Sequence, residues 1–290
     1  MEVQAILKQY RERLEAQALA PSLAAGENPC LELMTMLLAA PRELWPGLDL
    51  EERRRELASL FSWGVPNARA LDVLAAHAPL VECGAGMGYW SALLKTRGVD
   101  VLAYDIAPPA GEAQNDYHRF SRPPWMPIER QDSVRAARRH RDRTLVLCWP
   151  PYDDDRASYS VLRAYRGDTL IYIGEPDGAT GSARFHRELA LNWTLEDEVR
   201  LPNWPRLRDG LMVYRRNAVR RPLAERDRCF ECHRFIPTGA IGRCDECFVR
   251  KPTPLALQVG RHRIEYVQEM LDAMPAERRR ELEASPNRIR

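Results

Sequence analysis

The stretch LVECGAGMGYWSALLKTRGVDVLAYDI, residues 80–106, decides the fold. It opens with a short apolar run that ends in Glu82, passes through three alternating glycines, and then shows apolar residues at helical spacing. A second apolar run, residues 101–104, ends in Asp105. The order is strand, glycine-rich turn, helix, strand and acid. This pattern predicts a unit of a parallel α/β sheet with a ligand at its first turn.

The turn contains Gly84, Gly86 and Gly88. Glycine tolerates positive φ and lets a ligand approach the backbone without a Cβ in the way. The helix that follows offers free N–H groups at its N-terminus. Asp105 comes about twenty residues after the turn, where an acid can accept from the hydroxyls of a ribose. The same pattern also fits an α/β sheet whose glycine turn binds nothing.

The spacing of the glycines indicates which nucleoside the turn would bind. A dinucleotide fingerprint needs a third glycine at position 89, where this chain has Tyr89. The spacing G-x-G-x-G after Glu82 instead resembles the first motif of class I S-adenosylmethionine-dependent methyltransferases. The resemblance implies that Gly84 to Gly88 wrap the methionine end of the cofactor. It also implies that Glu82 helps to fix the amino group and that Asp105 holds the ribose.

Asp132 follows the next predicted strand. By the same resemblance it matches an acid that often accepts from the adenine amino group. Asp132 or Ser133 could equally cap the helix that follows. That helix carries a run of arginines between 135 and 143, and a charge run of this kind is usually a solvated face.

A second informative stretch begins where a buried-strand pattern, residues 144–148, runs into Trp149, Pro150, Pro151 and Tyr152. It resembles the fourth motif of amino-methyltransferases, in which Asp or Asn precedes Pro-Pro and an aromatic residue. The resemblance implies that the polar residue and a backbone carbonyl hold the target nitrogen while the aromatic ring stacks on the acceptor. Trp149 replaces the polar residue, and indole cannot accept a hydrogen bond from an amine. The stretch therefore predicts a rigid aromatic acceptor site; the alternative is a stiff turn.

Carboxylates near this motif could replace the missing acceptor. Asp153, Asp154 and Asp155 follow it directly, and they could equally cap the next helix. Glu175 follows the predicted strand 169–174 and should reach the same edge of the sheet. Glu175 is the carboxylate we expect to orient the acceptor or act as a base, unless it is simply solvated.

Two C-x-x-C pairs, Cys229 with Cys232 and Cys244 with Cys247, are separated by eleven residues. This spacing predicts a structural Zn²⁺ site of four thiolates in a closed tetrahedron. Redox pairs or disulfides are the alternatives, and they are disfavoured without a secretory signal. Zinc modules of this size often bind nucleic acid or protein, and local arginines surround this one.

The chain divides into three predicted regions. Residues 1–64 form a helical N-terminal cap, in which Arg53 to Arg55 lie on the solvated face of a helix. Residues 65–217 alternate strand and helix, which predicts an α/β, doubly wound, seven-stranded methyltransferase-type sheet. By the resemblance, the sheet ends with a pair of strands, 193–201 and 210–215, the last antiparallel. Residues 218–290 hold the zinc module and a C-terminal helix.

The composition sets limits on the class of protein. An apolar fraction of 45% permits a packed core, and a net charge of +2 neither requires nor excludes an anionic partner. No apolar run approaches the ~20 residues of a membrane span, and the N-terminus lacks the apolar core of a signal peptide. We therefore expect a cytoplasmic protein with no membrane contact. The oligomeric state stays open.

Together these observations lead to three hypotheses of function. The first is an S-adenosylmethionine-dependent methyltransferase whose acceptor is a nitrogen in RNA or protein. The second is a catalytically silent protein that keeps the cofactor fold and binds nucleic acid through its zinc module; Trp149 in place of an acid favours it. The third is a methyltransferase for a small aromatic or cationic molecule.

Overall fold

A computed structural model describes residues 3–18, 23, 26–109, 123–176 and 180–218. The chain divides into two compact units, and all the described residues belong to the first, Met1–Leu223 with Thr238–Ile241. The second unit, Ala224–Pro237 with Gly242–Arg290, lies outside the described residues. The predicted zinc ligands Cys229, Cys232, Cys244 and Cys247 and the predicted C-terminal helix therefore also lie outside them.

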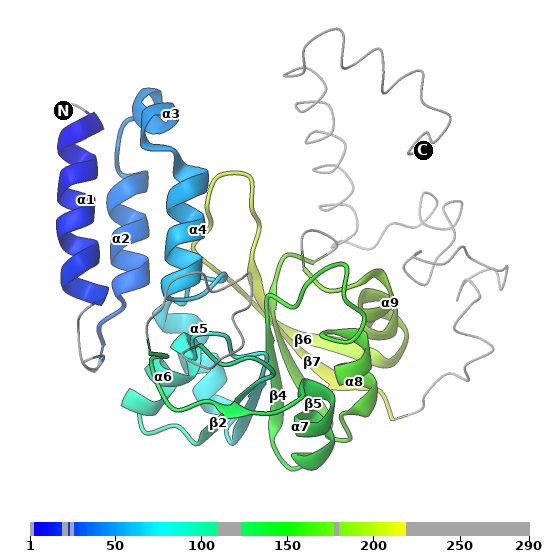
Figure 1. The fold of residues 1–290 in the computed structure, drawn as a ribbon. Coiled ribbons are helices and arrows are strands. Elements are labelled where there is room, and N and C mark those ends of the chain that lie inside the picture. Colours follow the sequence, from blue (N-terminus) through cyan, green and yellow to red (C-terminus); the bar gives the residue numbers. More distant parts are fainter. Residues whose placement is uncertain (1–2, 19–22, 24–25, 110–122, 177–179, 219–290) are drawn as a thin grey trace, which may run out of the picture. The chain divides into compact units, whose positions relative to one another are not determined.

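One seven-stranded sheet, in the order β3-β2-β1-β4-β5-β7-β6, organises the described residues (Figure 1). Its strands are β1 (Leu80–Cys83), β2 (Val101–Asp105), β3 (Glu129–Arg130), β4 (Thr144–Cys148), β5 (Thr169–Gly174), β6 (Trp193–Arg200) and β7 (Gly210–Arg216). The first five strands pair in parallel, and β7 runs antiparallel to both β5 and β6. The predicted seven-stranded sheet with its antiparallel last strand is confirmed.

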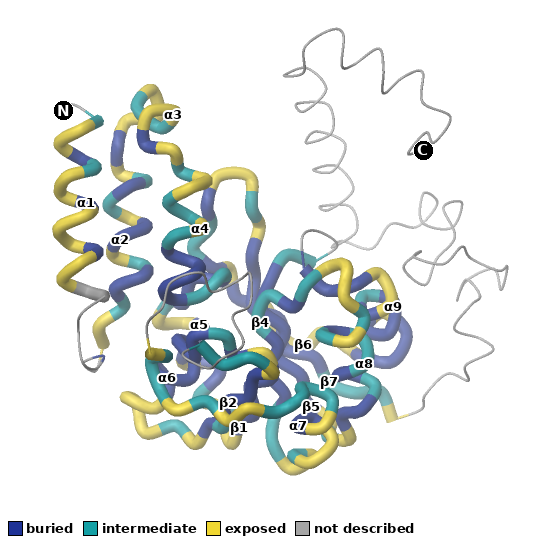
Figure 2. Tube along the Cα trace, in the orientation of Figure 1, coloured by how far each residue is buried: buried dark blue, intermediate teal, exposed yellow. Residues whose placement is uncertain are grey.

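Helices cover both faces of this sheet, because successive side chains of a strand point to opposite sides. Leu80 packs in one core and its neighbour Val81 in the other, and β5 divides its residues in the same way. The core that contains Val81 is covered by α7 (Ser133–Arg139), α8 (Tyr159–Ala164) and α9 (Ala183–Asn192). The central strands are buried on both sides (Figure 2), which explains their nearly continuous apolar sequences. The doubly wound arrangement is thus confirmed.

The other face carries the N-terminal helices. They are α1 (Val3–Ala18), α2 (Pro29–Leu38), the 3₁₀ turn η1 (Arg42–Leu44), α3 (Trp45–Leu48), α4 (Leu50–Leu60), α5 (Ala68–Ala76) and α6 (Tyr89–Thr96). Ile6, Tyr10 and Leu14 of α1 are buried in the same core as strand residues of β4 and β5. The N-terminal helices therefore share their core with the sheet.

One asparagine joins these helices to the glycine turn. Asn28 caps α2 by accepting from Leu31 N at 3.1 Å, and its Nδ2 donates to Pro66 O at 2.8 Å. Its Oδ1 also accepts from the hydroxyl of Tyr89 at 2.9 Å, and that hydroxyl accepts from Cys30 N at 3.2 Å. Tyr89 stands where a dinucleotide-binding turn would have its third glycine. Its side chain instead fixes α2 against the first turn of α6.

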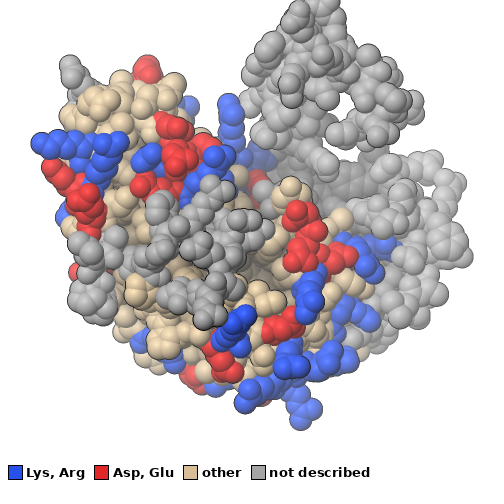
Figure 3. Space-filling model, in the orientation of Figure 1, with Lys and Arg blue, Asp and Glu red and all other residues tan. Residues whose placement is uncertain are grey.

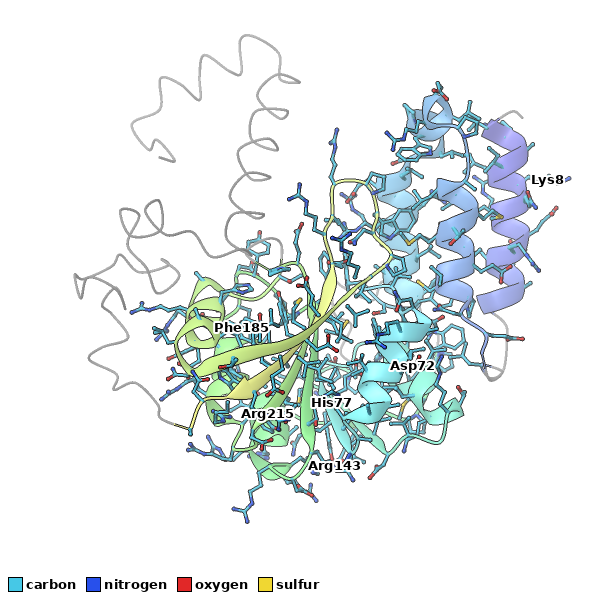
Figure 4. The ribbon with its side chains drawn as sticks, turned by 180° about the vertical axis from the view of Figure 1, so that it is seen from behind. Lys8, Asp72, His77, Arg143, Phe185 and Arg215 are labelled. Carbon is cyan, nitrogen blue, oxygen red and sulfur yellow. The ribbon has the colours of Figure 1, made fainter. Side chains whose placement is uncertain are left out.

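The sheet has two distinct edges. At the amino ends of the strands, Arg143 donates to both carboxylate oxygens of Asp100 at 2.9 Å, and Thr144 Oγ1 donates to His77 O at 2.8 Å. Figure 4 labels Arg143 and His77 at this edge. The predicted site residues lie at the opposite edge, where β1, β2, β4 and β5 end. Within the described ranges no helix combines the length and apolar character that crossing a bilayer requires.

Candidate active site

The glycine turn joins β1 to α6 and folds back on the neighbouring strand. Gly84, Gly86 and Gly88 have φ values of 77°, 56° and 68°, so all three adopt the left-handed conformation that favours glycine. The amides of Gly84 and Ala85 both donate to Tyr104 O, at 2.8 and 3.0 Å. A Cβ added to Gly84 would meet no atom within 4 Å, so the backbone is open on that side. The turn has the geometry that the sequence predicted.

Asp105, at the end of β2, fastens this turn. Its Oδ2 accepts from Gly86 N at 2.8 Å, and its Oδ1 accepts from Ala107 N at 2.9 Å. The residue is only 7% exposed. The next residue, Ile106, is by contrast one of the few exposed large apolar residues in the described part of the chain. Asp105 therefore shapes the turn and also places a carboxylate and an apolar surface at the ligand edge.

Glu82 lies on β1, two residues before the turn, and is buried. The hydroxyl of Ser91, on α6, donates to its Oε2. Burial raises the pKa of Glu82 to about 7; the hydrogen bond from Ser91 opposes the rise, and the nearby charge of Asp105 adds to it. Burial makes the ionised form of this carboxylate costly. A cation bound beside it would reduce that cost by pairing with its charge.

Asp132 shows the capping geometry that was one of its two predicted roles. Its Oδ1 accepts from Arg135 N at 3.2 Å at the start of α7, and its Oδ2 accepts from Arg156 at 2.7 and 3.1 Å. Burial works against ionisation, but the bonds from Arg156 and Arg135 lower the pKa of Asp132 below its usual value. Both oxygens are therefore used within the protein.

The Pro-Pro motif forms a fixed corner after β4. Trp149 has a φ of 50°, which is uncommon for a residue with a side chain, and its amide donates to Ile173 O at 2.8 Å. Pro150 O accepts from Gly181 N at 2.7 Å, and Pro151 forms a bridge to Thr180. Beyond this corner Tyr152 is 63% exposed. The motif thus presents one aromatic ring to solvent and holds another, Trp149, against the protein.

Glu175 reaches the same edge, as the sequence predicted, because it follows β5, the neighbour of β4. Its amide donates to Thr180 Oγ1 at 2.9 Å, and this bond ties the end of β5 to the bridge at Pro151. The acids after the motif are used elsewhere. Asp154 accepts from Arg156 N at 2.7 Å, and Asp155 pairs with Arg184 at 3.0 Å.

Three residues that the sequence did not assign to the site surround Trp149. The ring of Trp63 stacks on its indole with centroids 5.5 Å apart, and Arg54 lies over both rings. Asp209, in the connection between β6 and β7, is 4% exposed and lies beside the same indole. The expectation that Arg53 to Arg55 lie on a solvated face is wrong for Arg53 and Arg54, whose side chains are only 18% and 12% exposed. Arg53 lies over the ring of Tyr10, and the rings of Trp63 and Trp149 hold Arg54 in place.

The glycine turn and these acids lie near a common residue, Cys148. Burial raises the pKa of the Cys148 thiol, and the carboxylates of Glu82 and Asp209 both raise it further. Cys148 is the last residue of β4, which lies between β1 and β5 in the sheet. Among the described residues no group of three or more metal-ligating side chains could hold an ion.

The surface around the site is mixed in charge. Figure 3 shows acidic and basic side chains interspersed, with Lys and Arg gathered at the lower edge where α7 lies in Figure 1. Arg135, Arg138 and Arg139 of α7 are exposed, so the predicted solvated face of this helix is confirmed.

Comparison with known proteins gives structural likeness only. No family model matches the chain, and no curated protein matches it. Among solved structures, the magnesium protoporphyrin IX methyltransferase of Synechocystis with bound S-adenosylmethionine is 14% identical, covers 62% of this chain and 99% of its own, and has a TM-score of 0.37. A putative tRNA methyltransferase of Streptococcus pneumoniae is 11% identical over 74% of this chain and 94% of its own, with a TM-score of 0.39.

A third neighbour is the 1,6-didemethyltoxoflavin-N1-methyltransferase of Burkholderia thailandensis. It is 19% identical, covers 68% of this chain and 92% of its own, and has a TM-score of 0.36. The acceptors of the three neighbours differ from one another. Likeness at this level carries no information on the reaction of the present chain.

Proposed function

We propose that this chain is a class I S-adenosylmethionine-dependent methyltransferase whose acceptor is a nitrogen in RNA or protein. The observation that carries the proposal is the glycine turn closed by Asp105. In it, three glycines adopt positive φ and the carboxylate of Asp105 binds the amide of Gly86 at 2.8 Å. A turn fastened in this way and followed by a helix N-terminus is built for a nucleoside ligand.

The residues at the turn fit this cofactor. Gly84 is open on its Cβ side, so a ligand can lie directly against the backbone. Buried Glu82 suits the cationic amino group, and Asp105 retains acceptor capacity toward ribose hydroxyls because each of its oxygens has a second lone pair. Exposed Ile106 offers an apolar surface for the adenine. Asp132, which also caps α7, stays in the proposal as the acceptor for the adenine amino group, because each of its oxygens likewise has a second lone pair.

The chemistry would be a direct displacement. When bound, S-adenosylmethionine supplies a methyl group on a positively charged sulfur. The acceptor nitrogen donates its electron pair to the methyl carbon, the carbon–sulfur bond breaks with its electrons going to sulfur, and the acceptor releases a proton. Such a step needs alignment and desolvation more than covalent help from the enzyme. Exposed Tyr152 would stack on the acceptor, and Glu175 is the carboxylate proposed to orient it or take the proton.

A structural Zn²⁺ site at Cys229, Cys232, Cys244 and Cys247 is part of the proposal. It rests on the spacing of the two C-x-x-C pairs. Metal analysis of the full chain should find about one zinc per molecule, and the Cys229→Ser, Cys232→Ser double variant should lose it. A full chain without zinc would remove the module from the proposal.

The test of function is transfer itself. The full-length, zinc-loaded protein is incubated with radiolabelled S-adenosylmethionine and, separately, with total RNA and with protein from cells that lack it. Label should accumulate in one fraction and should be absent with an Asp105→Ala control, because that variant loses the cofactor. Binding of the cofactor without transfer to either fraction would favour a small acceptor. Absence of cofactor binding would overturn the proposal.

A further inference from the structure

A defined group of side chains, the aromatic–acid cluster, lies where β4 and β5 end. It consists of Arg54, Trp63, Trp149, Glu175 and Asp209. Four separate segments supply it: α4 and the residues after it, the Pro-Pro corner, the end of β5, and the connection from β6 to β7. Gly64 closes the cluster on one side, since a Cβ there would lie 3.4 Å from the Trp149 ring.

Asp209 is held firmly in this cluster by its backbone. Its amide donates to Asn203 Oδ1 at 2.5 Å, and its carbonyl accepts from Asn203 Nδ2 at 3.1 Å. The side chain is less well provided for. Asp209 is 4% exposed, and the indole N–H of Trp149 beside it favours its ionised form, yet neither Asp209 Oδ1 nor Trp149 Nε1 completes a hydrogen bond of normal geometry. A buried carboxylate oxygen that is bonded so weakly is costly, and a water, an ion or a ligand can complete it.

The aromatic half of the cluster shows which chemistry it favours. The guanidinium carbon of Arg54 lies 5.0 Å from the ring centroid of Trp63 and 5.1 Å from that of Trp149. Arg54 pairs with Glu51 at 3.4 Å, and its charge also acts on Asp209 and Glu175. The cluster therefore joins two indole faces to the charges of Asp209 and Glu175. Indole faces attract a planar cation, and carboxylates accept its N–H groups.

We propose that the aromatic–acid cluster is the acceptor site and that its ligand is the guanidinium of an arginine in a partner protein. The inference rests on the proposed function. Asp209 is then the positioning carboxylate that takes the place of the polar residue missing at Trp149. Arg54 is the internal guanidinium that the ligand displaces. A neutral nucleobase would offer N–H groups to Asp209 but no charge to the indole faces, so the cluster favours protein over RNA.

The test uses an acetylated glycine–arginine–glycine amide and the same peptide with citrulline, which keeps the shape of arginine and removes its charge. Both are titrated calorimetrically into the full-length protein, and a short single-stranded RNA is titrated in parallel. The arginine peptide should bind at least about tenfold more tightly than the citrulline peptide. Asp209→Asn should weaken it about tenfold, while Asp197→Asn, which changes an exposed aspartate of β6, should leave it unchanged.

Arg54→Ala should tighten the arginine peptide at least about threefold, because an internal competitor is removed. Equal binding of the two peptides, no effect of Asp209→Asn, or weaker binding to Arg54→Ala would overturn the inference. Binding of RNA that depends on Asp209 would overturn it in favour of a nucleobase. S-adenosylmethionine is titrated into the same variants. If S-adenosylmethionine binds normally but one of these peptide or RNA results fails, only this inference is rejected. If S-adenosylmethionine does not bind to the wild type, the proposed function is rejected.

Discussion

Asp105→Ala is expected to lower the affinity for S-adenosylmethionine by about a hundredfold or more. The variant would lose the proposed contact to the ribose, and it would also release the amides of Gly86 and Ala107, which the carboxylate now holds at 2.8 and 2.9 Å. Because Asp105 is only 7% exposed, water cannot easily replace those bonds. The turn would lose its shape together with its ligand. Calorimetric titration of the purified full chain measures the effect.

Asp100→Ala is a matched control, because it removes a carboxylate from the other end of the same strand. Asp100 is an exposed partner of Arg143, and an exposed ion pair contributes about 0–1 kcal/mol to stability. Its loss should leave cofactor affinity unchanged. Asp105→Asn should fall between the wild type and Asp105→Ala, since the amide oxygen can still accept from one of the two backbone groups. Cofactor binding by Asp105→Ala that equals the wild type would contradict the role assigned to this residue.

The elements that the sequence predicted well are those whose conformation is determined by residues close together in the chain. The apolar run of β1, the glycines with positive φ and the acid after β2 lie within 27 residues of one another, and each shapes its own stretch of backbone. Strands β4 and β5 were equally clear, because burial on both faces leaves almost continuous apolar runs. Proximity of the ends of neighbouring parallel strands then placed Glu82, Trp149 and Glu175 at one edge.

The parts that the sequence did not predict depend on contacts between distant segments. Arg54 belongs to a run of charges on a surface helix, and only the approach of Trp63 and Trp149 makes it buried. Asp209 looks like an ordinary turn residue in the sequence. Its burial depends on the packing of the connection between β6 and β7, whose Leu201 and Trp204 lie in the core. The capping role of Asp132 was recognised in the sequence, but its pairing with Arg156 was not. Sequence spacing carries no information on such pairs.

Binding of S-adenosylmethionine is expected to strengthen as the pH rises toward 7, with Glu82 as the cause. Burial raises the pKa of Glu82 to about 7, so at pH 6 most of the free protein carries a neutral carboxylic acid there. A ligand ammonium requires the ionised form, so affinity should rise by about tenfold per pH unit below 7 and then level off. Glu82→Gln should remove this dependence and bind about tenfold or more weakly at pH 7.5.

The side chains around Glu82 allow a second check of its role in the pH dependence of binding. Ser91, Asp105 and Cys148 all interact with this carboxylate, and the hydroxyl of Ser91 favours its ionised form. Ser91→Ala should therefore raise the pKa of Glu82 further and move the rise in affinity to higher pH, whereas Asp100→Ala should leave it in place. If the affinity of Glu82→Gln for S-adenosylmethionine still falls at low pH, the group that titrates is not Glu82.

The same pKa makes a prediction for the protein without ligand. Glu82 binds its proton more tightly in the folded state, with a pKa of about 7, than in the unfolded chain, where it has the ordinary glutamate value of 4.5. Its contribution to the free energy of unfolding is therefore largest at low pH and declines as the pH rises from 4.5 to 7. Relative to the wild type, Glu82→Gln should be more stable at pH 8 than at pH 5, as measured by denaturant titration. The free energy that the buried charge costs the free protein is what a bound ammonium would recover, which links the stability of the fold to occupancy of the site.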